Sequence, residues 1–137
     1  MSKKIKIIVF EPSKEVIPAK PPVVKEIDSS LESMQKVVGG WIQGLYPWDD
    51  PIALVCNEEG KLMGLPPNRF LLDDEGKPYD LLVGTFFLVG ADPEEEEFSS
   101  LSDEYIASFL EEKTCARYLG KLEDHPDVFL RLFGRKN

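Results

Sequence analysis

The opening of the chain has the apolar pattern of a β-strand. Within residues 5–10, isoleucine alternates with lysine in the first half, and the second half is apolar throughout. This pattern predicts a strand buried mainly on one face. Four prolines within residues 12–22 prevent regular pairing there, and apolar residues resume at 23–27. We therefore expect two strands joined by a long, exposed loop.

Residues 31–38 have the spacing of an amphipathic helix, because their apolar side chains fall on one helical stripe. Ser29, with Glu32 three residues later, forms a capping-box pattern at the start of this helix. Gly39 and Gly40 are expected to end it.

Two more helices are predicted near the C-terminus. Ser102 is a helix cap followed by two acids in the dipole-positive first turn. We expect Leu119 and Leu122 to extend the apolar stripe of this helix. After Asp124, a last short helix places three large apolar side chains on one face, namely Phe129, Leu132 and Phe133.

The middle of the chain alternates apolar runs with polar turns. β-Branched and aromatic residues favour strands at 41–46 and 52–56. Residues 57–60 then form a tight turn, in which Gly60 is expected to have a positive φ angle. Consecutive prolines break residues 62–72, where we expect a short helical turn capped by an asparagine and carrying Arg69, Phe70 and Leu71.

Residues 81–89 are apolar on both alternating faces apart from Gly84 and Thr85, so we expect this strand in the middle of a sheet, covered on both sides. The order of the elements indicates an α+β fold with a largely antiparallel sheet, two main helices and a short C-terminal helix. We expect residues 1–112 to form a single α+β domain. Residues 113–137 are expected to form a helical C-terminal extension packed on the domain or on a partner.

The charge balance narrows the choice of partners. The 137 residues carry 25 acidic and 16 basic side chains, a formal net charge of -9. This acidity opposes nonspecific attraction to nucleic acid or anionic membranes, so we expect neither partner. A basic partner, a small anion or a protein is easier to accommodate. An acidic inhibitor that imitates DNA is a further interpretation.

The cysteines and the apolar runs bear on the compartment. Cys56 and Cys115 are far apart and have no metal-spaced neighbours, which predicts buried thiols in a reducing cytosol. The first apolar run is too short for a signal peptide, and no run approaches about 18 apolar residues. We therefore expect a cytoplasmic protein.

No catalytic constellation is evident in the sequence. His125, the only histidine, lies beside Asp124 at a predicted helix start, where a local structural role competes with a Ser-His-Asp triad. Carboxylates cluster in turns without an EF-hand pattern, and neither a Walker loop nor a dinucleotide-binding glycine motif is present. We assign no catalytic, cofactor or metal residues, expect no cofactor, and predict a protein that is not an enzyme.

Two polar turns and one aromatic residue make up the candidate binding surface, which comprises Asn57, Glu58, Glu59, Lys61, Asn68, Arg69 and Trp48. In one hypothesis the Asn68 cap and the Arg69 guanidinium clamp an anion at the rim of a cavity shared with Lys61. In the other, Arg69 pairs with Glu58 or Glu59 and fastens the two turns together.

Three aromatic residues form either a platform for a partner or part of the core. They are Trp41, Tyr46 and Trp48. Because Trp48 lies in a turn between a proline and two aspartates, we expect it to be the most exposed of the three.

Five ordered motifs resemble a known family. They are LESMQKVVGGWI, YP, NEEGK, LPxNR and GTFF, and the resemblance spans approximately residues 3–112. The family is domain of unknown function 3846, a group of small phage and mobile-element proteins often encoded near antirestriction genes. A longer Pro-rich link before residue 23 and an added segment after about residue 113 depart from its pattern.

The resemblance implies a phage or mobile-element origin and no particular activity. We therefore expect an accessory protein, in the cytoplasm of the bacterial host, that binds a host protein and serves counter-defence. The alternative is a sequestering protein that holds a small anionic, nucleotide-like ligand between residues 57–61 and the Asn68–Arg69 pair. A homo-oligomer is compatible with both hypotheses.

Overall fold

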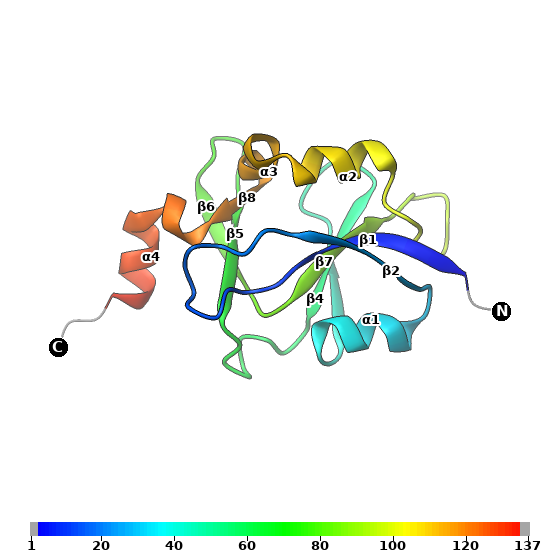
Figure 1. Ribbon diagram of the computed structural model, residues 1–137, viewed down its shortest axis with the longest axis horizontal. Coiled ribbons are helices and arrows are strands. Elements are labelled where there is room, and N and C mark those ends of the chain that lie inside the picture. Colours follow the sequence, from blue (N-terminus) through cyan, green and yellow to red (C-terminus); the bar gives the residue numbers. More distant parts are fainter. Residues whose placement is uncertain (1–2, 135–137) are drawn as a thin grey trace.

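Two antiparallel sheets form the framework of the protein, whose residues 3–134 are described by a computed structural model (Figure 1). The large sheet has the spatial order β2 (Val23–Asp28), β1 (Lys4–Phe10), β7 (Phe86–Gly90), β4 (Ile52–Asn57), β3 (Ile42–Leu45). The small sheet has the order β6 (Pro78–Val83), β5 (Pro67–Leu72), β8 (Leu119–Lys121). The helical segments are α1 (Leu31–Val38), α2 (Asp103–Leu110), α3 (Glu112–Tyr118), the 3-10 turn η1 (Leu122–Asp124) and α4 (Pro126–Phe133). The predicted α+β fold with antiparallel pairing is confirmed.

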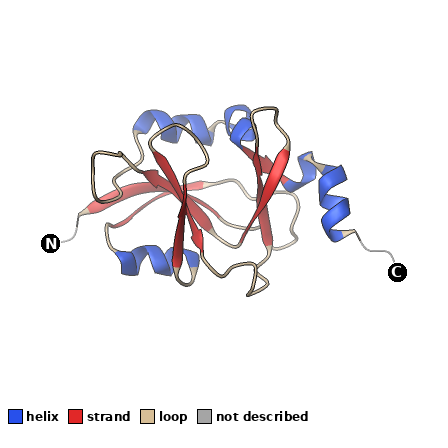
Figure 2. Cartoon of the chain, turned by 180° about the vertical axis from the view of Figure 1, so that it is seen from behind, coloured by secondary structure: helices blue, strands red, loops and turns tan. Residues whose placement is uncertain are grey.

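Helices cover both faces of the large sheet, with α1 on one side and α2 on the other (Figure 2). The prediction that β1 is buried mainly on one face is therefore wrong. Ile5 and Ile7 pack on the α1 side, while Ile8 and Phe10 belong to the cluster on the α2 side. β1 lies between β2 and β7, so its second half has packing partners in every direction.

The expected single strand at residues 81–89 is two strands. Gly84 interrupts the apolar run with a φ angle of 73°, and the chain passes from β6 in the small sheet to β7 in the centre of the large one (Figure 1). Only glycine adopts this left-handed conformation without steric cost. The continuous apolar run therefore spans two sheets.

The short helical turn expected after the two prolines is also wrong. Residues 67–72 form β5, which pairs with β6 on one side and with β8 on the other. Pro67 is tolerated because it is the first residue of the strand. Apolar side chains at positions 70 to 72 are buried in this strand, and their burial outweighs the local turn signal.

Two capping details differ from expectation. The helix α1 begins one residue later than the Ser29 pattern suggested, because the side chain of Ser30 accepts the backbone N–H of Ser33. Gly39 ends the helix in the left-handed conformation, as predicted. Gly60 does not have the expected positive φ; the polar turn continues past it, and Gly64 has the left-handed conformation with φ 69°. Gly60 lies instead where a Cβ would sit 3.0 Å from Val83.

The C-terminal segment contributes to the core. Leu119 and Leu122 do not extend the second helix: Leu119 is in β8, Leu122 is in η1, and both are buried. The backbone of Glu111 is extended and separates α2 from α3. The extension is therefore a strand with flanking helices, and the predicted short last helix is α4. No helix in residues 3–134 is long and apolar enough to cross a membrane.

Candidate functional site

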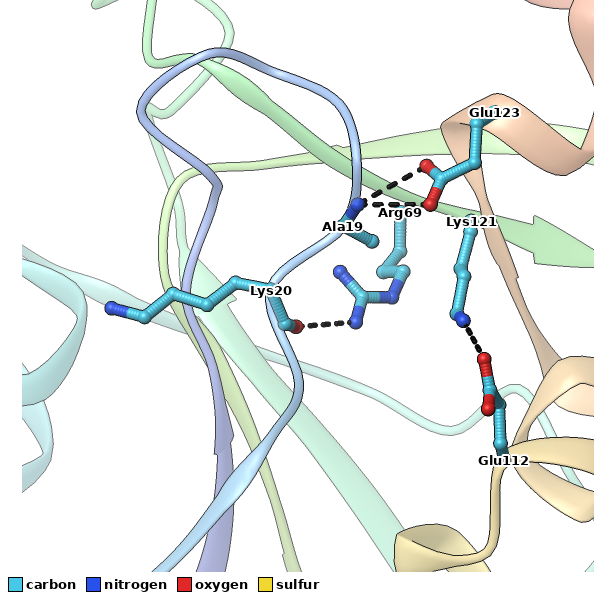
Figure 3. A network of polar contacts seen from close by, with 6 residues as sticks. All are labelled: Ala19, Lys20, Arg69, Glu112, Lys121 and Glu123. Atoms are coloured by element: carbon cyan, nitrogen blue, oxygen red, sulfur yellow. Dashed lines mark hydrogen bonds and ion pairs between the residues drawn. The ribbon is translucent and has the colours of Figure 1, made fainter.

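Arg69 lies inside the molecule, between β5 and the Pro-rich loop that joins β1 to β2 (Figure 3). Its side chain is buried, with 2% of its surface exposed. The Nη2 atom donates to the carbonyl of Lys20 at 2.8 Å, and Nη1 donates to the side-chain and backbone oxygens of Asn68 at 3.0 and 3.3 Å. The guanidinium carbon lies 5.3 Å from the centroid of the Phe10 ring. Arg69 thus connects the small sheet to the loop.

Neither geometry expected for Arg69 is present. No ion pair in the described residues joins Arg69 to Glu58 or Glu59. Lys61 pairs with Asp80 at 2.9 Å, and Lys61 and Arg69 line different cavities. The reason is that residues 67–72 form a strand, which directs Arg69 into the interior rather than beside the turn.

The charge of Arg69 has no carboxylate within ion-pair distance among the described residues. A guanidinium has five N–H groups, and the three bonds above all end on neutral oxygens. Burial lowers the pKa of Arg69 below its usual value, and the negative charge of Glu123 partly opposes this. The arginine is nevertheless a buried cation, and such charges are normally paired.

Arg69 also lines a cavity of about 190 Å³. Nε makes no hydrogen bond in the described part of the chain, and no fully buried side-chain nitrogen or oxygen of residues 3–134 lacks a partner, so Nε keeps some accessible surface. The Pro-rich loop, α2, α3 and β8 supply most of the wall, and its residues are mainly apolar: Ala19, Pro21, Pro22, Phe109, Leu110, Cys115, Ala116 and Leu119.

Two further charged groups line the same cavity. Lys121, from β8, forms an ion pair with Glu112, at the start of α3 (Figure 3). The hydrogen bond from Lys121 lowers the pKa of Glu112. Outside the lining, Glu123 accepts the backbone N–H of Ala19 at 2.9 Å and holds the loop in place. The Lys121–Glu112 pair has no net charge, whereas the positive charge of Arg69 has no such partner in the described residues.

The two cysteines are buried free thiols, as the sequence predicted. Burial raises the pKa of Cys115 to about 11, despite the opposing charge of Arg69. Burial also raises the pKa of Cys56. Both thiols are therefore protonated near neutral pH and are poor nucleophiles.

The other predicted site residues separate into two places. Asn57, Glu58 and Lys61 line a second cavity of about 290 Å³ between β4 and β6. The side chain of Asn57 is engaged there, since its amide donates to the Val38 carbonyl at 3.2 Å and its oxygen accepts the N–H of Glu59 at 2.8 Å. Asn68 is buried in the core and does not cap a helix. The structure thus brings Asn57, Glu58 and Lys61 together and leaves Asn68 and Arg69 elsewhere.

The expected order of aromatic exposure is wrong. Trp48 is partly buried, with its ring centroid 5.5 Å from those of Phe109 and Tyr118. Trp41 and Tyr46 are each 64% exposed. Trp48 lies in the turn but packs back on α2 and α3, which sequence spacing does not reveal.

His125 packs edge-on against Phe70, at 5.9 Å between ring centroids, and it lies close to Gly120. These contacts support the local structural role considered for this histidine. In residues 3–134 no group of three potential metal ligands is close enough to hold an ion.

Sequence reasoning missed the residues that share the Arg69 cavity, among them Glu112, Cys115 and Lys121. Arg69 and Lys121 are paired positions of β5 and β8, and Lys20 is 49 residues away from Arg69. No local motif marks residues that meet only after two strands and a loop have assembled.

Comparison with known proteins agrees with the resemblance noted from the motifs. The model of the family described as Domain of unknown function (DUF3846) matches residues 5–114. No curated protein and no solved structure matches the chain significantly. The match covers almost all of the large sheet, β5, β6, α1 and α2, ends within α3 and does not reach β8. The chain therefore belongs to the family of domain of unknown function 3846.

Proposed function

We propose that this protein acts by binding, without catalysis, and that it holds a small anion against Arg69. The observation that supports this is a buried guanidinium that lines a cavity, keeps an Nε–H without a protein acceptor and has no carboxylate within ion-pair distance in the described residues. An anion there would supply the missing counter-charge. Charge-assisted, bidentate hydrogen bonds to guanidinium are also about twice as strong as neutral ones.

The size of the cavity argues against a nucleotide-like ligand, which the sequence had suggested. Pockets for drug-sized ligands are about 300 to 1,000 Å³, and this cavity is about 190 Å³. The ligand class is therefore smaller than a nucleotide, and sequestration of a small metabolite anion is the form of the proposal that fits.

The test compares wild-type protein with Arg69→Met by NMR titration, using acetate, propionate and inorganic phosphate as probes. We expect at least one probe to shift the amide signals of Ala19 and Arg69 in the wild type, and none to shift the corresponding signals in the variant. Arg69→Met also removes the donor from the Asn68 side-chain oxygen and the Lys20 carbonyl, so we expect it to lower the free energy of unfolding by about 1 to 3 kcal/mol, and the variant is titrated under conditions where it is folded.

Lys77→Met is the matched control for this experiment, since Lys77 is an exposed lysine that pairs weakly with Glu75 and lies outside the cavity. It should bind like the wild type. Equal binding by Arg69→Met, or no binding of any probe by the wild type, would overturn the proposal.

A second candidate function is binding of a host protein, which the phage setting of the family resemblance suggests, with counter-defence as the purpose. The observation that favours it is a set of exposed apolar side chains around β6 and α4. Leu62 is 89% exposed, Leu130 is 60% exposed and Leu132 is 53% exposed. Exposed apolar groups on a small protein often mark contact sites.

The double variant Leu130→Gln with Leu132→Gln tests this second function. Both side chains are exposed, so stability should change by about 0.5 kcal/mol or less, while cross-linking to a host protein should be lost. Sedimentation velocity of the same variant shows whether the surface joins two copies instead. A partner captured equally by wild type and variant would rule out this surface, and Arg69→Met should leave the capture unchanged.

A further inference from the structure

We infer that the ligand of the Arg69 cavity is a monocarboxylate with a short apolar tail. This inference rests on the proposed function, because it specifies which anion the same cavity takes. The charge of the surrounding groups, the chemistry of the wall and the volume of the cavity carry it.

The charges favour one negative charge rather than two. Arg69 is the one cation of the cavity lining without a carboxylate partner among the described residues, since Lys121 is neutralised by Glu112. Glu123 lies close enough to act on the charge of Arg69. A second negative charge on the ligand would have no free cation in the lining and would meet the Glu123 carboxylate. Like charges brought together in such a site repel each other and weaken binding.

The donor geometry fits a carboxylate. The guanidinium is planar, with N–H groups in a fixed fork that matches the two oxygens of a carboxylate. Nη1 and Nη2 already donate to Asn68 and Lys20, which leaves the Nε–H and the second N–H of Nη2 for a ligand. A carboxylate has two oxygens that can accept from both N–H groups, whereas a ligand with one acceptor atom cannot pair with both.

The wall and the volume fit a short tail. Beyond Arg69 the lining is formed mainly by apolar residues, including Phe109, Leu110 and Leu119. A cavity of about 190 Å³ corresponds to about six water volumes of roughly 30 Å³ each. A carboxylate with about three further carbon atoms has that size. Its tail would replace water against apolar surface, which is favourable.

The experiment is a calorimetric titration of the full chain with butyrate, butyramide, succinate and inorganic phosphate. We expect butyrate to bind and butyramide, which has the same shape without the charge, to bind at least about 10-fold more weakly. Succinate and phosphate should also bind at least about 10-fold more weakly than butyrate, because of the second charge.

A charge variant sharpens the test. Glu112→Gln releases Lys121 from its ion pair, so the affinity for succinate should rise by about 10-fold relative to the affinity for butyrate. Glu104→Gln is the control, because Glu104 is an exposed acid in the first turn of α2 and does not line the cavity. It should leave the order of the four probes unchanged.

The outcomes separate this inference from the proposed function. If phosphate or succinate binds as tightly as butyrate and Arg69→Met abolishes both, anion binding stands and the monocarboxylate inference is overturned. Tight binding of butyramide, or a Glu112→Gln variant with unaltered selectivity, overturns it too. If Arg69→Met binds butyrate as the wild type does, or if no anion binds, the proposed function itself fails.

Discussion

Replacing Asn68 with leucine should lower the free energy of unfolding by about 3 to 5 kcal/mol. The buried side-chain amide of Asn68 donates to the carbonyl of Phe10 at 2.9 Å and to that of Gly84 at 2.8 Å. Its oxygen accepts from Arg69 at 3.0 Å. Leucine has a similar volume but cannot bond, so two buried carbonyls and the arginine each lose a partner. The cost per unsatisfied buried group is about 1 to 3 kcal/mol.

Chemical denaturation of wild type and Asn68→Leu measures this effect. Gln43→Leu is the matched control, since Gln43 is an exposed amide with no side-chain hydrogen bond in the described residues; it should change stability by about 0.5 kcal/mol or less. An Asn68→Leu variant as stable as the control would show that this amide does not join the sheets.

Replacing Gly84 with valine should destabilise the fold by about 3 to 5 kcal/mol. The φ angle of Gly84 is 73°, and a β-branched residue is strained there by about 1 to 3 kcal/mol. In addition, a Cβ at this position would lie 2.6 Å from the Cδ1 atom of Leu65, so the side chain of Leu65 must move. Both destabilising effects arise at the connection between β6 and β7.

Gly76→Val separates the two costs, because Gly76 has nearly the same φ of 78° but no atom within 4 Å of its Cβ position. We expect this variant to lose only the strain of about 1 to 3 kcal/mol. Thermal and chemical unfolding should therefore rank wild type, Gly76→Val and Gly84→Val in decreasing stability. Equal losses for both variants would show that contact with Leu65 contributes nothing.

Elements with a clear local pattern were predictable. The stripe and glycine stop of α1, the Ser102 cap of α2 and the strands β3 and β4 all have the expected positions within one or two residues. In each case the signal is contained within one element, as a periodic apolar face or a capping residue. Such signals survive folding because tertiary contacts reinforce them.

Elements whose local sequence signal conflicts with their place in the fold were not predictable. Residues 67–72 begin after two prolines and contain an asparagine, yet the strands on both sides make them the centre of the small sheet. Gly84 looked like an interruption within one strand, although it is the point where the chain changes sheets. Which strands become neighbours depends on burial of apolar surface shared by distant segments, and a local window contains none of that information.

The candidate site shows the same division. Sequence motifs drew attention to Arg69 because it is the last residue of the LPxNR motif. From the sequence we wrongly placed it beside the polar turn at residues 57–61. The Pro-rich loop, Lys121 and Cys115 meet Arg69 only through the pairing of β5 with β8 and the return of the loop over them. Burial removes the Arg69 guanidinium from water, and no carboxylate in the described part of the chain lies within ion-pair distance of it. The sequence could not show this, because desolvation depends on where a residue lies in the folded structure.

The sequence by itself thus determined the α+β class, the family, the acidic surface and the helix ends, since composition and short-range periodicity contain that information. Only the tertiary structure decided that there are two sheets, that residues after 113 supply one strand of the second, and that Arg69 lines a mainly apolar cavity. These features arise where segments far apart in the chain pack together and exclude water. The free energy gained depends on the apolar surface that the segments bury against each other, so no single segment determines it.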